Sequence, residues 1–373
     1  MQLDFDDMSD VINQRNKGCA RSEVACFNGI VGWVNHCPLQ RKELFVKLFS
    51  EVDLSSTNMS FLEMASQENL VKNNLLCANF LVQGSLMFIQ RMSTSTFLLI
   101  GGTTEHEAVV YNIMSKETTQ FPDLNIGRMK ATSAKVGKRV FVIGGIAAGK
   151  TLLKSCEMLD LDQPDKWIVL PDMIQARHLC GSGLIAGQIY VTGGMNTYHL
   201  SSCEKFDIQA NVWTRTENML QKRCSHGCVV CNGLLYCIGG KKGTEHISSC
   251  ECYDVESKKW KEIAPLNEPR RSMASVVLDG TIFAIGGIGH NKQTLSTVER
   301  YFPERNTWEY VAPLLLSCSR ASACVLGTRL YVIGGSSGVA SLKTVQQYDP
   351  DSDSWTICFE MKKATSSTTV VVV

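Results

Sequence analysis

The sequence has little excess charge, no long apolar run and no basic start. Its 373 residues include 37 Lys and Arg against 36 Asp and Glu, which leaves a net charge of +1. That balance argues against a strongly basic nucleic-acid-binding protein and against an acidic disordered chain. No apolar run approaches the ~20 residues that span a bilayer, and the acidic residues 1–10 do not resemble a secretion signal. We therefore expect a cytoplasmic protein with no membrane or nucleic-acid partner.

Cysteine, by contrast, is abundant, with 16 residues. Such a number is typical of disulfide-linked secreted scaffolds, but without a signal sequence a reducing compartment is the better expectation. We therefore predict that the cysteines are free thiols. Hydrophobic residues make up 44% of the chain, which is enough for sizeable cores.

The strongest pattern is a pair of glycines that recurs six times, 43 to 49 residues apart. Each pair ends an apolar segment, and two further series of large apolar residues follow the pairs in step. The Gly pairs fall at 101–102, 144–145, 193–194, 239–240, 286–287 and 334–335; the first series is Tyr111, Leu159, Phe206, Tyr253, Tyr301 and Tyr348; the second is Phe121, Trp167, Trp213, Trp260, Trp308 and Trp355.

A period near ~50 residues, with apolar strands that end in Gly pairs, resembles the kelch repeat, which forms one four-stranded propeller blade. The fourth repeat shows the expected strands, beginning at 227–231 and turning tightly at Asn232 and Gly233. Glycine allows close approach of two chains, and the aromatic series can fill the wedges between blades. We therefore predict a mainly β fold with a six-bladed kelch β-propeller over residues 91–373.

The first repeat lacks an innermost strand before residues 96–100. The β-branched, uncharged tail at 368–373 has the pattern of that missing strand. An unpaired tail of this kind would be an aggregation hazard, and pairing it with the first blade removes the exposed edge. We therefore predict that the C-terminal strand closes the propeller.

The first ninety residues have a helical period instead. Phe27, Ile30 and Val34 share one face of a predicted helix, which Ser22 can cap and Pro38 ends. Further helices are indicated by the apolar face Leu44, Phe45, Leu48 and Phe49, by a capping box at Ser60 and Glu63, and by Leu75, Leu76, Phe80 and Leu81. We expect a small all-α domain over residues 1–90.

The segment GIVGWVNHCPLQRKELF (29–45) resembles the BACK domain of BTB-BACK-kelch proteins. In that family a BTB domain precedes BACK, and the first BACK helices help to bind the cullin scaffold. The resemblance spans roughly residues 3–87 and begins inside BACK. It therefore implies a partial BACK domain without the BTB domain, as in a fragment, an incomplete gene sequence or a short isoform.

Two motifs suggest other chemistry. GGIAAGKT (144–151) matches the phosphate-binding loop, which needs a following helix whose N-terminus faces the phosphate. The repeat register instead aligns residues 155–160 with 202–207 and 249–254, so that a strand is expected there. We therefore expect no nucleotide cofactor.

The second motif is a cluster of thiols and a histidine in the fourth repeat that suggests zinc, since Cys228 and Cys231 have ligand spacing. The register places small apolar residues at the equivalent positions, which makes these cysteines strand fillers, and alternation points strand neighbours to opposite faces. No metal site is therefore expected. The cluster consists of Cys224, His226, Cys228, Cys231, Cys237, Cys250 and Cys252.

No catalytic constellation stands out above the repeats, so we expect a binding protein rather than an enzyme, with no catalytic residues. The loops after the Gly pairs and the links between blades lie on one face, and these loops carry more Lys and Arg than Asp and Glu. Such a face attracts acidic partners, although solvated loops with unrelated charges are the alternative.

The arginines fall into two positions of the repeat register. Arg128, Arg177, Arg223 and Arg270 lie sixteen residues before a Gly pair and are predicted to tie blades together. Arg320 lies two residues later in the register, where the family resemblance places partner contacts. The candidate partner-binding residues are Lys150, Ser225, Lys241, Lys242, His246, Arg271, Ser272, His290, Lys292 and Arg320.

Two functions follow from the resemblance. The first is a non-catalytic substrate adaptor that captures an acidic peptide segment and, in a longer BTB-containing form, presents it to a cullin-3 RING ubiquitin ligase. The second is a cytoskeletal binder or scaffold, for example of actin. The partner's identity and the oligomeric state do not follow from the sequence, because loops vary freely on a repeat scaffold.

Overall fold

The computed structural model describes residues 23–36, 41, 44–49, 64–83 and 95–373. The chain divides into two compact units, residues 1–93 and 94–373. Each unit is described by itself. No helix among the described residues is long and apolar enough to cross a membrane.

The described part of the first unit is helical. Phe27, Phe45 and Phe49 lie in its core, with ring centroids 5.5 to 6.4 Å apart. The predicted helices are present, although the side chains of Leu75 and Leu76 are mostly exposed. The predicted caps and stop at Ser22, Pro38, Ser60 and Glu63 lie outside the described residues. The helical segments are α2 (Glu23–His36), α4 (Phe45–Phe49), α6 (Asn69–Lys72) and residues 64–67 and 75–83.

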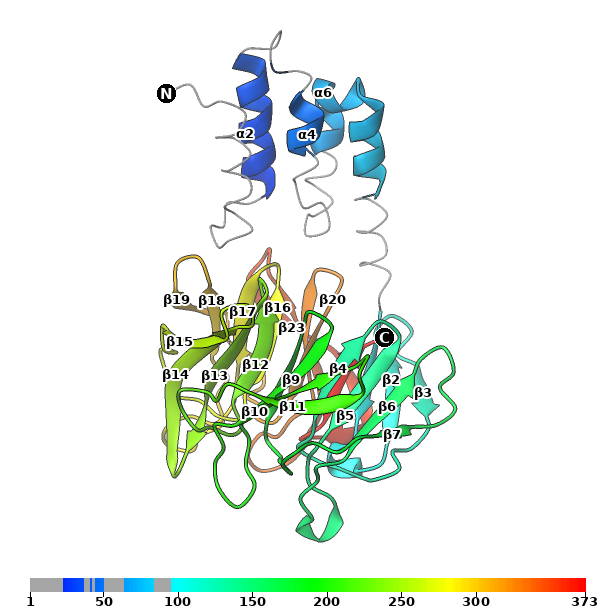
Figure 1. Ribbon diagram of the computed structural model, residues 1–373, viewed down its shortest axis with the longest axis vertical. Coiled ribbons are helices and arrows are strands. Elements are labelled where there is room, and N and C mark those ends of the chain that lie inside the picture. The colour runs from blue at the N-terminus through cyan, green and yellow to red at the C-terminus, as the bar shows by residue number, and fades with distance from the viewer. Residues whose placement is uncertain (1–22, 37–40, 42–43, 50–63, 84–94) are drawn as a thin grey trace. The chain divides into compact units, whose positions relative to one another are not determined.

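The second unit is a six-bladed β-propeller in which each blade is a four-stranded antiparallel sheet (Figure 1). Its blades are numbered in chain order. Blade one has β24 (Thr369–Val372), β1 (Thr96–Ile100), β2 (Ala108–Asn112) and β3 (Thr118–Phe121); blade two has β4 (Thr132–Val136), β5 (Arg139–Ile143), β6 (Cys156–Asp160) and β7 (Ile168–Leu170); blade three has β8 (Gly181–Ile185), β9 (Gln188–Thr192), β10 (Cys203–Asp207) and β11 (Val212–Thr216).

The remaining blades follow the same order from the axis outward. Blade four has β12 (Gly227–Cys231), β13 (Leu234–Lys242), β14 (Glu245–Asp254) and β15 (Lys259–Ile263); blade five has β16 (Ala274–Leu278), β17 (Thr281–Ile285), β18 (Val298–Phe302) and β19 (Thr307–Val311); blade six has β20 (Ser322–Leu326), β21 (Arg329–Ile333), β22 (Leu342–Asp349) and β23 (Ser354–Thr365).

The C-terminal tail supplies the innermost strand of blade one, where the sequence predicts it. β24 pairs antiparallel with β1, with Leu98 opposite Val371, and the C-terminus lies beside the strands of blade one in Figure 1. The Thr96 hydroxyl donates to the Val373 carbonyl at 2.6 Å. The first and last parts of the propeller thus share one sheet, which removes the open edge of β1.

The aromatic residues fill the wedges between blades, as predicted. In blade four the Tyr253 ring lies 5.0 Å from the Trp260 ring across the sheet and 6.0 Å from the Tyr190 ring of blade three. The Trp260 indole N–H also donates to the Glu217 carbonyl in the link from blade three, at 3.0 Å. Burial of these large rings therefore binds neighbouring blades as well as neighbouring strands.

The Gly pairs stand where two chains nearly touch. Gly239 and Gly240 have φ of +54° and +107°, angles that residues with a Cβ rarely adopt. A Cβ on Gly239 would lie 2.7 Å from the Arg270 carbonyl oxygen, and one on Gly240 would lie 2.8 Å from that of Cys224. The repeated glycines thus allow the links between blades to pass directly over the strand ends.

The phosphate-loop motif does not lead into a helix. A short 3₁₀ turn, η4 (Ala148–Lys150), interrupts the loop, and the chain then enters strand β6. The strand that the repeat register predicts at 155–160 is therefore confirmed, and no helix N-terminus is available to face a phosphate at this motif.

The two cysteines with zinc-ligand spacing occupy opposite faces of β12. Cys231 packs with Tyr236 and Tyr301, whereas Cys228 packs with Leu235 and Tyr253. Among the described residues, no group of three or more His, Cys, Asp or Glu side chains is placed to hold a metal ion.

One prediction about blade four was incomplete. The loop expected after its Gly pair is a two-residue turn, because β13 continues to Lys242 and pairs with β14 from Glu245 onward. A register shift between Ile238 and Gly240 carries the ladder past the glycines. Gly243, with φ of +61° and open space around it, permits the tight turn.

Candidate binding face

The strand directions define two faces of the propeller. The loops after the Gly pairs lie at the same end of the blades as the links between blades, since Cys224 in a link bridges to Lys241 and Arg271 in the next link bridges to Ile288. We call this end the Gly-pair face. The opposite end, which carries the tight strand turns such as Asn232–Gly233, is called the turn face.

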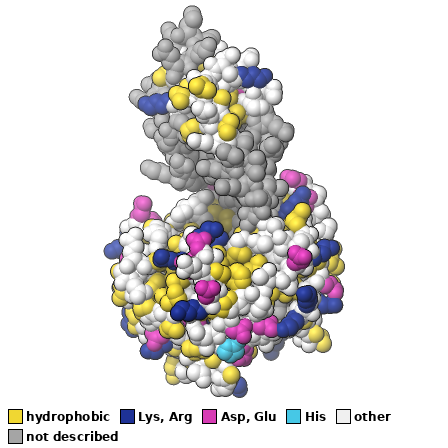
Figure 2. All heavy atoms as spheres, turned by 90° about the vertical axis from the view of Figure 1, so that its right-hand side faces the viewer, with side chains coloured by type: hydrophobic (Ala, Val, Ile, Leu, Met, Phe, Trp, Pro, Cys, Tyr) yellow, Lys and Arg dark blue, Asp and Glu magenta, His cyan; other side chains and the backbone are white. Residues whose placement is uncertain are grey.

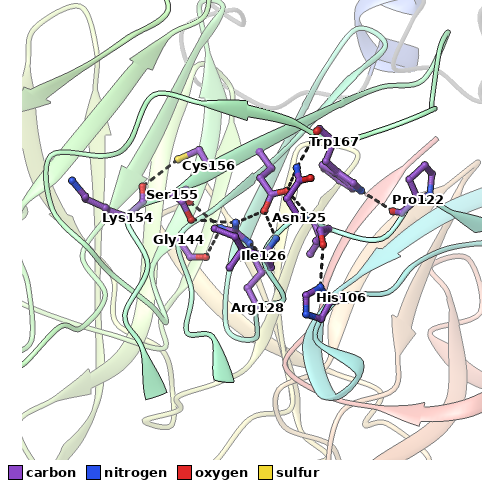
Figure 3. Close-up of polar contacts among 12 residues, drawn as sticks. His106, Pro122, Asn125, Ile126, Arg128, Gly144, Lys154, Ser155, Cys156 and Trp167 are labelled. Atoms are coloured by element: carbon purple, nitrogen blue, oxygen red, sulfur yellow. Dashed lines mark hydrogen bonds and ion pairs between the residues drawn. The ribbon is translucent and has the colours of Figure 1, made fainter. Parts of the chain in front are cut away.

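Just beneath the Gly-pair face, buried arginines tie consecutive blades together, as the sequence predicts. Arg128, in the link between blades one and two, forms an ion pair with Glu157 at 2.5 Å and donates to the carbonyls of Gly144 and Ser155 (Figure 3). Glu157 also accepts a bond from the Asn125 amide at 2.8 Å. The same tie recurs as Arg177–Glu204, Arg223–Glu251 and Arg270–Glu299, at 2.6 to 2.7 Å.

The tie is neutral at the junction of blades five and six. Cys318 occupies the arginine position and Gln346 the glutamate position, and both side chains are buried. Gln346 accepts from the Leu316 amide at 2.9 Å and donates to the Leu316 carbonyl at 3.0 Å. An amide can therefore hold the link in place where no buried charge needs compensation.

Five residues that lie two positions after the tie positions, together with Ser367 of the tail, form a closed ring around the axis. Each N–H donates to the carbonyl of the ring residue in the preceding link, at 2.7 to 3.1 Å, and the last bond, from Lys130 to Ser367, completes the circle. All six have φ between 53° and 59°, which costs a residue with a side chain about 1 kcal/mol or more. The ring residues are Lys130, Leu179, Ser225, Ser272, Arg320 and Ser367.

The ring surrounds a cavity of about 120 Å³ at the centre of the Gly-pair face. Its lining shares Cys180, His226 and Thr368 with a deeper cavity of about 230 Å³ along the axis. The deeper cavity is lined largely by hydroxyls, including those of Ser182 and Ser275. A central depression thus leads from the ring into the propeller.

The cations at this depression lack the carboxylates that the buried arginines have. Arg320, Arg271 and Lys130 form no ion pair with any residue that the structure describes, and the Arg320 side chain is exposed. On the side of the propeller seen in Figure 2, by contrast, Lys and Arg are interspersed with Asp and Glu. The ring region therefore has an uncompensated positive charge.

The protonation equilibria report the same positive potential. Burial and the charge of Arg320 lower the pKa of Lys130, and the same two causes lower the pKa of Arg271. Burial and nearby lysines also lower the pKa of His178 and His199. A bound anion would relieve this repulsion, so the region favours ligands with carboxylates or other negative groups.

His246 positions Arg271. The imidazole Nδ1 donates to the Gly289 carbonyl at 2.7 Å, so that Nε2 accepts from Arg271 Nε at 2.8 Å. The pKa of His246 is lowered, mainly by burial and further by Arg271 and Lys241. The neutral imidazole thus fixes the guanidinium near the ring while leaving its terminal nitrogens available for a ligand.

The structure brings together some of the predicted contact residues. Ser225, Ser272 and Arg320 line the central cavity, and Arg271 and His246 are hydrogen-bonded beside it. Lys241 lies directly opposite His246 in the β13–β14 hairpin. The remaining candidates have exposed side chains and do not line the cavity; they are Lys242 at the end of β13 and, in loops, Lys150, His290 and Lys292.

The predicted contact set omits the other three ring residues of the cavity lining, Lys130, Leu179 and Ser367. The repeat register already aligns Lys130 and Leu179 with Arg320, so this signal could have found both. Ser367 lies in the tail, where no following Gly pair sets the register.

A six-bladed propeller of four-stranded blades, each with a Gly pair at the end of its second strand, is the architecture that kelch repeats form. The Kelch motif matches four successive segments, residues 176–220, 222–267, 269–315 and 317–362, which correspond to blades three to six. The chain therefore contains kelch repeats.

Among known proteins, the chain is similar to Kelch-like proteins at low identity. It is 24% identical to human Kelch-like protein 11 over 59% of this chain and 28% of that protein. It is 27% identical to human Kelch-like protein 28 over 65% of this chain and 39% of that protein. The chain thus spans about two fifths or less of the length of these relatives.

A likeness of fold extends to the solved "Structure of YjhT". The two share 15% identity and a TM-score of 0.59, over 67% of this chain and 88% of the other. This likeness shows the propeller fold alone. The resemblance of residues 3–87 to BACK stays a prediction.

Proposed function

We propose that this chain is a non-catalytic adaptor that binds an acidic segment of a partner protein on its Gly-pair face. The observation that carries the proposal is a group of three cations, Lys130, Arg271 and Arg320, that form no ion pair with any described residue. Lys130 and Arg320 line the central cavity, and Arg271 precedes the ring residue Ser272. The four buried arginines, by contrast, each have a glutamate. The similarity to Kelch-like proteins supports a binding role rather than a reaction.

Recognition would rest on charge-assisted hydrogen bonds. An Asp or Glu side chain entering the depression can accept from the guanidinium of Arg320 and from the hydroxyls of Ser225 and Ser272. Each such bond contributes about 1.5–3 kcal/mol, and the ring holds its donors on rigid backbone. The outer lysines, Lys241 and Lys242, would speed the encounter rather than define the fit.

The experiment compares affinity capture by three forms of the full chain. The test variant carries Arg320→Ala, Lys241→Ala and Lys242→Ala on the Gly-pair face. The matched control carries Lys116→Ala, Lys138→Ala and Lys258→Ala, which remove three exposed cations from turns of the turn face. We expect partner proteins that the wild type and the control retain and that the test variant loses.

Direct binding then measures the loss. For a captured partner, or a synthetic acidic peptide derived from it, Arg320→Ala alone should weaken binding about 10-fold or more, since one charge-assisted bond is removed. Equal capture by all three forms would show that the Gly-pair cations do not hold the partner.

We also propose, from the family resemblance, that a longer BTB-containing form presents its partner to a cullin-3 RING ubiquitin ligase. Measured cullin-3 affinity should rise when a BTB domain is joined ahead of residue 1. If the variant with Arg320→Ala, Lys241→Ala and Lys242→Ala still co-sediments with actin filaments, the cytoskeletal function is favoured instead.

A further inference from the structure

Blade four contains two cysteines that face each other across neighbouring strands. Cys228 of β12 is the direct partner of Cys237 of β13. Because Cys231 and Leu234 flank a two-residue turn, they form a hydrogen-bonded pair, and alternation makes Cys228–Cys237 a non-hydrogen-bonded pair. Such pairs have Cα atoms about 4.5 Å apart, within the range that a disulfide bridges. Both thiols are free in the structure.

The two sulfurs share one polar neighbour, Thr192 of blade three. The Cys237 thiol donates to Thr192 Oγ1 at 3.4 Å, and the Thr192 hydroxyl lies 3.7 Å from Cys228 Sγ. His226 Nε2 lies 2.9 Å from the same hydroxyl, and its buried Nδ1 has no hydrogen-bond partner among the described residues. The pair therefore has polar neighbours in Thr192 and His226, although Cys203 and Met219 also pack with Cys237.

This site changes the acidity of the thiols. Burial opposes ionisation of Cys237, but hydrogen bonds with Cys228, His226 and Thr192 outweigh it, so the pKa of Cys237 lies below its ordinary value. The pKa of Cys228 is raised, because of its hydrogen bond with Cys237 and because of burial. Of the 13 cysteines whose thiols the structure describes, Cys237 alone has a lowered pKa. One shared proton thus leaves thiolate character on the pair.

A small oxidant can reach the pair along the axis. Cys228 is partly exposed and, with His226, lines the 230 Å³ axial cavity, whereas Cys237 is fully buried behind it. The cavity lining is rich in hydroxyls, which suits a polar molecule about the size of water. Hydrogen peroxide is such a molecule, and it needs no opening wider than this cavity.

We propose that Cys228 and Cys237 form a modification site that hydrogen peroxide converts to a disulfide. As Cys228 Sγ attacks the peroxide, its proton moves to Cys237. The O–O bond breaks, one oxygen departs as hydroxide, and the other remains on Cys228 as a sulfenic acid. Cys237 passes its proton to that hydroxide and attacks the sulfenic sulfur, which expels a second hydroxide that solvent protonates. In total, one thiol, one thiolate, one peroxide and one proton from solvent yield one disulfide and two waters.

The test treats the folded full chain with graded hydrogen peroxide, then quenches, unfolds and alkylates it for mass spectrometry. Trypsin releases residues 224–241 as one peptide that contains both cysteines together with Cys224 and Cys231, so fragmentation of the peptide must assign the linked positions. We expect this peptide to lose two hydrogens and to regain alkylation at both positions after dithiothreitol. Chymotryptic cleavage between Leu234 and Cys237 then yields two fragments that remain linked.

Neighbouring thiols serve as internal controls. Cys231 and Cys252 belong to the same blade, and their raised pKa values predict oxidation only at higher peroxide. If Cys228 and Cys237 remain alkylatable at doses that oxidise the partly exposed Cys180 or Cys358, or if Cys228 links to another cysteine, the proposal is wrong.

Variants separate the chemistry from the fold. Cys228→Ser should abolish the disulfide, whereas Cys231→Ser should form it at the wild-type rate. Thr192→Val removes the shared hydroxyl and should slow disulfide formation about 10-fold, as expected for loss of hydrogen bonds to a developing thiolate. Each variant is first compared with the wild type by thermal unfolding. Disulfide formation at an unchanged rate in a folded Thr192→Val variant would contradict the role of the site.

Discussion

At the scale of single residues, arginine has two opposite roles that the register separates. Arg270 is fully buried and paired with Glu299 at 2.7 Å, while its neighbour Arg271 reaches the Gly-pair face without a carboxylate. Burial of a charge is tolerated only with a partner, so the buried position requires a glutamate two strands away. The half-buried position of Arg271 has no such partner, and its guanidinium is available for a ligand.

Removing one buried arginine should be costly. Arg223→Met would leave Glu251 buried without its cation, and burial already raises the pKa of Glu251 above its ordinary value. We expect the free energy of unfolding to fall by about 3–5 kcal/mol, measured by urea denaturation at pH 7.

The chain itself supplies the matched control for that variant. Arg223→Cys combined with Glu251→Gln reproduces the neutral pair found as Cys318 and Gln346, and should recover much of the lost stability. If the single variant is as stable as the wild type, the tie is not a structural element.

The pH dependence of binding should reflect His246. Its Nε2 accepts from Arg271 only while the imidazole is neutral, and its pKa lies below the ordinary value, mainly because of burial. Affinity for an acidic peptide should therefore fall as pH drops through that pKa, because a protonated His246 can no longer hold Arg271 and repels it. His246→Gln should reduce that fall in titration calorimetry. An affinity that rises over the same range would contradict the role of His246.

At the scale of secondary-structure elements, the Gly pairs decide how strands and links fit. Gly239→Ala combines a positive φ with a contact of 2.7 Å to the Arg270 carbonyl, whereas Gly243→Ala has a similar φ and open space. Gly243→Ala should cost about 1–2 kcal/mol. Gly239→Ala should cost clearly more and lower the midpoint of thermal unfolding further. Equal losses would show that conformation alone, and not close approach, explains the glycines.

The sequence predicts these elements because repetition makes each position visible six times. Alignment of Glu157 with Glu204 and Glu251 identifies β6 as a strand, in spite of the phosphate-loop motif that precedes it. The ring is not predicted in this way, since its members range from Leu179 to Arg320 and share only backbone geometry. The extended β13–β14 hairpin also escapes prediction, because its turn depends on the single residue Gly243.

The candidate site was therefore predicted in part. The register identifies Arg320 as unlike the buried arginines, and the structure places it at the central cavity. It does not reveal that His246 holds Arg271 or that Thr192 lies between two thiols, because those contacts join different blades.

At the scale of the whole molecule, the pairing of β24 with β1 closes the propeller and holds its six sheets together. Removing residues 369–373 would delete β24, uncover the edge of β1 and expose Leu98, which is fully buried. The loss of Val371 burial alone is worth about 1.5–3 kcal/mol, and the open edge invites association. Light scattering should detect oligomers, and thermal unfolding should begin at lower temperature. A truncated chain that stays monomeric with an unchanged midpoint would contradict the closure.

The central claim, that the Gly-pair face binds the partner, is tested most directly by hydrogen exchange of the full chain with and without a captured acidic partner. The proposal predicts slower amide exchange in residues 241–246, 288–293 and 318–320, and unchanged exchange in the turns at 137–138 and 279–280 of the turn face. Protection confined to the turns, with no change around Arg320, would contradict it.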